Sequence, residues 1–118
     1  DFIVQGGGYD SEFGPIKLYD DIVNESGNGS KNELATIAMA KESRPHTANS
    51  QFFFNAGDNK NLDPGRQWGY TVFGSIIEGE EIMAAMSEVN THFDEMLSWD
   101  DVPVKPVILI KATLLPED

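Results

Sequence analysis

Short apolar runs, separated by polar and glycine-rich stretches, predict several strands and a single helix. Strands of buried or half-buried sheets appear in a sequence as roughly four to eight residues of alternating or continuous apolar character. Alternation within one aromatic run places Phe53 on the opposite face from Phe52 and Phe54. The five predicted strands lie at 2–5, 34–40, 51–54, 69–76 and 107–115.

One segment carries the period of a helix. Apolar residues recur in it at i, i+3, i+4 and i+7, which forms a stripe along one helical face. Glutamates lie at its beginning, where the helix dipole favours negative charge. The sequence therefore predicts a helix over 80–89, with an apolar stripe of Ile82, Met83, Ala85, Met86 and Val89.

The remaining stretches predict loops. They are polar or rich in glycine and proline, and they lie at 9–30, 41–49, 56–67 and 90–106. Gly6, Gly7 and Gly8 end the first strand and permit a left-handed backbone and the close approach of other groups. Five strands and one helix in 118 residues favour one mainly β domain over 1–118, built as a barrel or closed sheet with a helix over one end.

Composition excludes several classes of function. The chain has 20 acidic and 8 basic residues and a formal charge of −12, which repels phosphate backbones, so we expect no nucleic-acid partner. The absence of cysteine excludes disulfides, thiol catalysis and cysteine-bound zinc. No apolar run is long enough for a membrane-spanning helix, so we expect no membrane partner. The charge fits either a solvated acidic surface or a salt-adapted or secreted protein.

The beginning of the chain resembles a strand already in progress. Asp1 stands directly before the apolar run Phe2-Ile3-Val4. A buried strand needs partners on both sides. We therefore expect further sequence upstream.

Individual residue types leave their roles open. Phe53 either packs in the core or lines a ligand pocket, and Gln51 is either a surface residue or a ligand contact. His46 and His92 lie in separate predicted loops with no paired ligand near them, so we predict no metal site.

Three segments carry a family signature. The first is Phe2-Ile3-Val4-Gln5-Gly6-Gly7-Gly8, the second is Ala38-Met39-Ala40 followed by Asn49-Ser50-Gln51-Phe52-Phe53, and the third is Trp68-Gly69-Tyr70-Thr71-Val72-Phe73-Gly74. In this order and spacing they resemble the cyclophilin family of peptidyl-prolyl cis-trans isomerases, over nearly all of the chain. The third segment is similar to the bacterial branch. The ending at 102–116 is similar to periplasmic members, so we expect a periplasmic location, with a cytoplasmic one as the alternative.

The resemblance implies a closed eight-stranded barrel capped by helices, here incomplete because the first two strands and the first helix would lie upstream. It implies an isomerase that needs no cofactor and no metal, acts on proline-containing polypeptides and is a monomer when complete.

The resemblance also assigns the parts of a site. Gln51 matches a glutamine that hydrogen-bonds the substrate backbone, and Gln5 matches one that orients the catalytic arginine. The main chain at Ala40 and Lys41 matches positions that pair with the peptide. The walls of the proline pocket are then Phe2, Ile3, Phe53, Leu62 and Tyr70.

Three departures from the family pattern affect the expected activity. The catalytic arginine of the family would lie upstream of Phe2, so we predict that these 118 residues alone isomerise poorly. Asn61 stands where many members carry an aromatic residue, which predicts weak binding of cyclosporin-type ligands. Tyr70 stands where eukaryotic members have histidine, and it can still pack on the prolyl ring.

Two other readings of the same residues remain open. A cyclophilin-like module could grip proline peptides as a chaperone without turnover, and the missing arginine and Asn61 favour it. A soluble barrel of unrelated function is the third hypothesis, and a flat fluorescence titration of Trp68 with a proline peptide would favour it.

Overall fold

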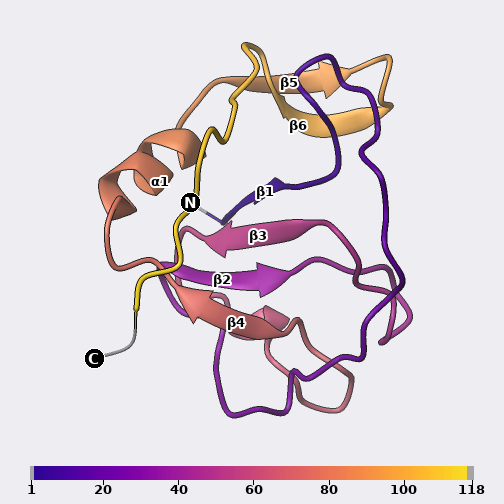
Figure 1. The fold of residues 1–118 in the computed structure, drawn as a ribbon, viewed down its shortest axis with the longest axis vertical. Coiled ribbons are helices and arrows are strands. Elements are labelled where there is room, and N and C mark those ends of the chain that lie inside the picture. Colours follow the sequence, from indigo (N-terminus) through magenta and orange to yellow (C-terminus); the bar gives the residue numbers. More distant parts are fainter. Residues whose placement is uncertain (1, 117–118) are drawn as a thin grey trace. The chain divides into compact units, whose positions relative to one another are not determined.

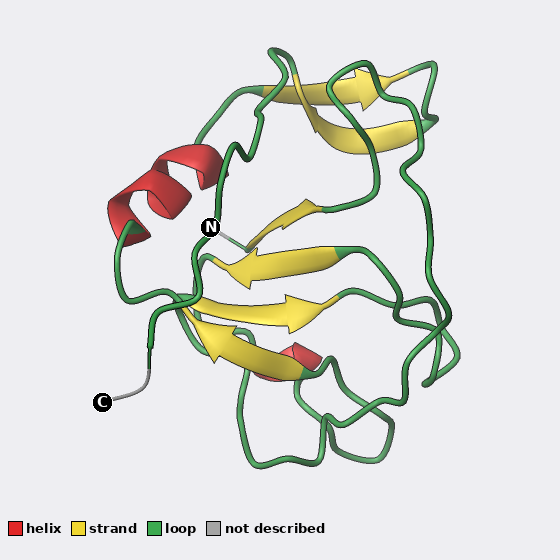
Figure 2. Cartoon of the chain, viewed as in Figure 1, coloured by secondary structure: helices red, strands yellow, loops and turns green. Residues whose placement is uncertain are grey.

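Four short strands form one antiparallel sheet in the first part of the chain (Figures 1 and 2). The order across the sheet is β1 (Ile3–Gly6), β3 (Phe52–Asn55), β2 (Thr36–Met39) and β4 (Val72–Ser75). Each corresponds to a predicted strand, with bounds shifted by a few residues. The computed structural model describes residues 2–116, and its chain separates into two compact units between Glu88 and Val89.

The register of the sheet places one row of side chains on one face. Phe53 of β3 lies opposite Gln5 of β1 and Ala38 of β2, and Ala38 lies opposite Val72 of β4. Residues opposite one another in paired strands share a face of the sheet. The buried apolar cluster of this unit, formed by Ala38, Phe53 and Val72, therefore follows directly from the strand pairing.

The predicted helix forms as α1 (Glu80–Ser87) and is two residues shorter than expected. Gly79 precedes it with a left-handed backbone, φ 93°, and Glu80 and Glu81 occupy the first turn. Met83 is buried, but Ile82 is 62% exposed. The predicted apolar stripe is thus only partly covered by the residues that the structure describes.

The second unit contains a hairpin that the sequence reading missed. Strands β5 (Thr91–Asp94) and β6 (Trp99–Pro103) pair within the stretch predicted as the loop 90–106. The turn between them has a left-handed Ser98, φ 54°, and the Leu97 N–H donates to Asp94 Oδ1 at 2.9 Å. Local pairing across a tight turn needs no long apolar run, which is why the polar composition concealed it.

The predicted last strand, 107–115, was wrong. Residues 104–116 are irregular, although Val107, Ile108, Leu109 and Ile110 have high β propensity. A strand needs a hydrogen-bonding partner, and no described strand pairs with this segment.

The fold class is confirmed as mainly β, but the closed eight-stranded barrel is not seen. The described residues contain six strands in two sheets, against about five predicted. Strands β1 and β4 are the two edges of the larger sheet and do not pair with each other. No helix among residues 2–116 has the length and apolar character required to cross a membrane.

Candidate active site

The candidate site is centred on Phe53. Its side chain is 2% exposed and belongs to the buried cluster with Ala38 and Val72. Phe52 and Phe54 contact each other edge-to-face on the opposite side of the strand, with ring centroids 5.7 Å apart. The predicted alternation within this aromatic run is therefore confirmed.

Four residues from separate segments pack against this cluster: Ile3, Ala40, Leu62 and Tyr70. The rings of Phe53 and Tyr70 meet edge-to-face, with centroids 5.7 Å apart and an interplanar angle of 77°. Ile3 comes from β1 and Leu62 from the short 3-10 helix η1 (Lys60–Leu62). The structure thus brings together four of the five residues predicted to wall a pocket.

Phe2 is the exception. It is 49% exposed, whereas the other four predicted wall residues are buried or half-buried. Its carbonyl accepts hydrogen bonds from the Ala56 N–H at 3.0 Å and from Asn59 Nδ2 at 2.9 Å. Through these two bonds the Phe2 carbonyl ties the beginning of the chain to the segment after β3.

Gln5 and Gln51 lie beside the apolar cluster and hydrogen-bond each other. Gln5 Nε2 donates to Gln51 Oε1 at 2.9 Å. Gln51 lies two residues before Phe53 and so tends toward its face, which Gln5 shares through the register. Gly8 leaves room for the contact, because a Cβ there would lie 2.9 Å from Gln51 Cδ. No described residue accepts from Gln51 Nε2, so both of its hydrogens are available to a ligand.

The glycine run also fixes the start of the β3 segment. Gly7 has φ 87°, and a Cβ on it would lie 2.5 Å from the carbonyl oxygen of Ser50. A side chain there would be both strained and overlapped. The predicted close backbone approach is confirmed.

Ala40 and Lys41 adjoin the cluster from the end of β2. The Ala40 N–H donates to the carbonyl of Gln51 at 3.0 Å, so only its carbonyl is open to a peptide. The ammonium of Lys41 lies 4.6 Å from the centroid of the Tyr70 ring. Such a separation is within the range of cation–π attraction. Asn61 is exposed on η1, next to Leu62.

A buried asparagine network, which the sequence reading missed, holds Leu62 and Tyr70 together. The Asn32 side chain is 1% exposed, and its Nδ2 donates to the carbonyls of Leu62 and Tyr70, both at 3.2 Å. Asn55 Nδ2 in turn donates to Asn32 Oδ1 at 3.0 Å. Neither Asn32 nor Asn55 belongs to an apolar periodic pattern in the sequence that would predict its burial.

A second asparagine fixes the backbone just before Tyr70. Asn24 Nδ2 donates to the Gly69 carbonyl at 2.9 Å, and the Gly69 N–H donates to Ser26 Oγ at 3.2 Å. The Asn24 N–H donates to His46 Nδ1 at 3.0 Å. His46 also packs on Trp68, with ring centroids 5.1 Å apart. The histidine therefore supports a loop, and residues 2–116 contain no cluster of metal-ligand side chains.

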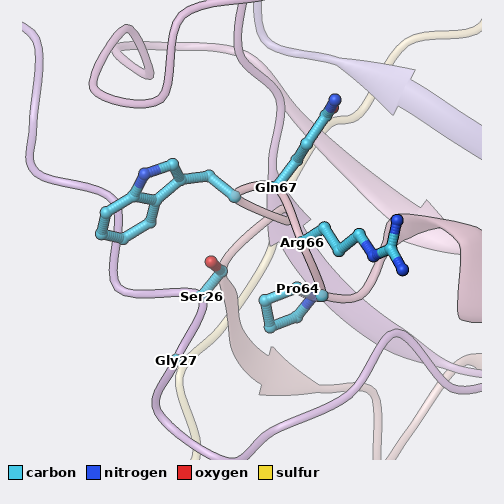
Figure 3. A pocket seen from close by; sticks show the side chains of 7 residues that line it. Ser26, Gly27, Pro64, Arg66 and Gln67 are labelled. Atoms are coloured by element: carbon cyan, nitrogen blue, oxygen red, sulfur yellow. The ribbon is translucent and has the colours of Figure 1, made fainter.

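An open pocket of about 200 Å³ is lined in part by Trp68 of this loop (Figure 3). It lies between Ser26-Gly27 and the loop carrying Pro64, Arg66 and Gln67. Arg66 thus lines this pocket.

The sequence of the chain matches a known protein family. Residues 1–114 match the family described as cyclophilin type peptidyl-prolyl cis-trans isomerase/CLD. The chain is 38% identical to peptidyl-prolyl cis-trans isomerase cyp18 of Streptomyces antibioticus, over 98% of this chain and 70% of that protein. It is 38% identical to peptidyl-prolyl cis-trans isomerase A of Dickeya dadantii, over 97% of this chain and 60% of that protein. It is 35% identical to peptidyl-prolyl cis-trans isomerase B of Escherichia coli K12, over 96% of this chain and 70% of that protein.

Proposed function

Because the chain belongs to the cyclophilin-type family of peptidyl-prolyl cis-trans isomerases, we propose that the Phe53 cluster receives a prolyl ring and favours a rotated X-Pro amide. The packing of Ile3, Leu62 and Tyr70 against Phe53 carries this proposal, because it forms an apolar wall beside Gln51, whose Nε2 hydrogens are available to a ligand. Apolar surfaces with a few placed polar groups are typical of small-ligand sites.

The chemistry asks only for binding that favours one geometry. The cis and trans forms of an X-Pro amide differ by about 0.5–1 kcal/mol, but the barrier between them is ~18–20 kcal/mol. No covalent bond is made or broken. A site accelerates the exchange if it binds the twisted amide more tightly than the planar one.

Each residue of the site has a part in this proposal. The Phe53 and Tyr70 rings hold the pyrrolidine and exclude water, while Gln51 Nε2 donates to the carbonyl of the substrate backbone. Gln5 holds the Gln51 amide in orientation through its own hydrogen bond. The pyrrolidine, which contains the prolyl nitrogen, and the backbone carbonyl held by Gln51 then stay fixed while the carbonyl of the X-Pro amide turns about its C–N bond.

The twisted prolyl nitrogen gains a lone pair, and a donor aimed at it stabilises the transition state. The family resemblance assigns that donor to an arginine that is not among these 118 residues, and we propose that it lies elsewhere in the protein. The chain spans only 60–70% of the length of the relatives described above. We propose likewise that the strands needed to close the barrel lie elsewhere in the protein.

Asn61 bears on larger ligands. We propose weak binding of cyclosporin-type ligands, because an exposed asparagine replaces an aromatic residue at the rim beside Leu62. The Asn61→Trp variant should bind such ligands more tightly, as measured by calorimetry, and an unchanged affinity would contradict this assignment.

The principal test is an exchange assay on the protein expressed from its complete reading frame. We expect acceleration of X-Pro isomerisation and a loss of about tenfold in kcat/KM for Gln51→Ala, which is the worth of one hydrogen bond of about 1.4 kcal/mol. Gln67→Ala removes a glutamine from the separate pocket and is the matched control.

Three outcomes separate the hypotheses. Turnover that falls in Gln51→Ala but not in Gln67→Ala supports the enzyme. Peptide binding that depends on Gln51, without turnover, supports a proline-binding module. A Gln51→Ala variant with full turnover contradicts the assignment of the site.

A further inference from the structure

Lys41 is a cation held at the candidate site without a carboxylate partner. Its ammonium lies 4.6 Å from the Tyr70 ring centroid and 3.3 Å from the carbonyl oxygen of Glu42, to which it donates. Among residues 2–116 no carboxylate lies within ion-pair distance of it. This is notable in a chain with 20 acidic and only 8 basic residues.

The aromatic contact determines where this charge lies. Tyr70 is itself fixed, edge-to-face on Phe53 and through its carbonyl on Asn32. A lysine side chain loses considerable rotamer freedom when it is ordered. Because the Lys41 ammonium already contacts the Tyr70 ring and the Glu42 carbonyl, part of that loss precedes the arrival of a ligand.

The distance to a bound proline is short. The Tyr70 ring forms part of the wall that receives the pyrrolidine in the proposed function, and consecutive Cα atoms lie about 3.8 Å apart. A residue next to the proline therefore has its side chain within reach of an ammonium 4.6 Å from that ring.

We infer that Lys41 is a specificity-determining residue that favours peptides with a glutamate or aspartate next to the proline. This inference rests on the proposed function and adds a substrate class to it. The overall charge of −12 opposes acidic peptides at long range, so the preference arises locally. It is therefore confined to the residues next to the proline and does not extend to acidic peptides in general.

The test compares peptides that differ only beside the proline, with the protein expressed from its complete reading frame. Glu-Pro, Gln-Pro, Pro-Glu and Pro-Gln peptides are measured for kcat/KM by exchange and for Kd by titration. We expect a glutamate peptide to be favoured over its glutamine counterpart by about two- to fivefold, the range of a partly exposed ion pair. The ratio should approach one in Lys41→Gln and invert in Lys41→Glu.

Lys17→Gln is the matched control. It removes the same charge and a similar contact, since Lys17 lies 5.4 Å from the Tyr19 ring centroid in an exposed loop. It should retain the wild-type ratio. A wild-type ratio of one at both positions, or a ratio that survives in Lys41→Gln, overturns the inference.

The two proposals fail differently. If no peptide is bound or turned over, the proposed function fails and the inference with it. If all peptides are bound or turned over equally, only the role of Lys41 fails. Because the ratio is also read from Kd, the inference remains testable in a protein that binds without turnover.

Discussion

The two walls of the candidate site are held in place by different means. Phe53, on the strand wall, lies between β1 and β2 and is positioned by backbone pairing on both sides. Leu62 and Tyr70, on the loop wall, are joined by one backbone hydrogen bond of 2.9 Å and by the amide of Asn32. Pairing of strands distributes the support over many groups, whereas the loop wall depends on a few buried polar contacts.

The strand wall gives the largest expected effect. Phe53→Ala should lower the free energy of unfolding by about 3–5 kcal/mol, because a ring that is 2% exposed is removed from the core. Phe54→Ala on the opposite, half-buried face of the same strand is the control and should cost less. Urea denaturation measures both. Equal losses would show that the cluster around Phe53 is not the better packed face.

The loop wall is tested by two glycines of the same loop. A Cβ at Gly69 would lie 2.4 Å from the Pro64 nitrogen and 2.7 Å from the Leu62 carbonyl oxygen. Gly69→Ala should therefore destabilise by about 3 kcal/mol, at the upper end for overpacking, and should weaken peptide binding. A Cβ at Gly65 meets nothing within 4 Å, so Gly65→Ala should change stability by less than about 0.5 kcal/mol. Two variants with the same denaturation midpoint would mean that the loop adjusts freely.

The difference between the walls explains what could be predicted from sequence. Local patterns predict the strand containing Phe53, the alternation of its side chains and the close approach at the glycine run beside Gln51. The structure confirms all three. The proximity of Leu62 and Tyr70 was assigned by resemblance alone. The sequence did not predict that Asn24 and Asn32 are buried, because a polar residue within a polar stretch is normally exposed.

The errors outside the site have a related cause. The strand predicted at 107–115 had apolar residues but no partner among the described strands, and the hairpin of β5 and β6 had partners but few apolar residues. Strand formation depends on pairing, which a local pattern does not report.

Asn32 tests the polar support of the loop wall directly. Asn32→Ala removes the donor to Leu62 and Tyr70 and the acceptor for Asn55, so we expect a loss of about 2 kcal/mol. Asn28→Ala is a control, since Asn28 is exposed and its Nδ2 donates to one carbonyl, that of Val72. Hydrogen exchange of the Tyr70 N–H, which donates to Leu62, should accelerate in Asn32→Ala more than in Asn28→Ala. An unchanged exchange rate of the Tyr70 N–H in Asn32→Ala would show that its hydrogen bond to the Leu62 carbonyl is enough to close the loop.

The smallest expected effect concerns the contact of Gln5 with Gln51 at the edge of the strand wall. Gln5→Ala should cost only a few-fold in kcat/KM, because the hydrogen bond is exposed and contributes about 1 kcal/mol or less. If Gln5 acts by orienting the Gln51 amide, the same substitution in a Gln51→Ala background should cost nothing further. A double-mutant cycle on kcat/KM measures this coupling. Additive losses would mean that Gln5 acts independently of Gln51, and the strand wall would then need no polar support of the kind on which the loop wall depends.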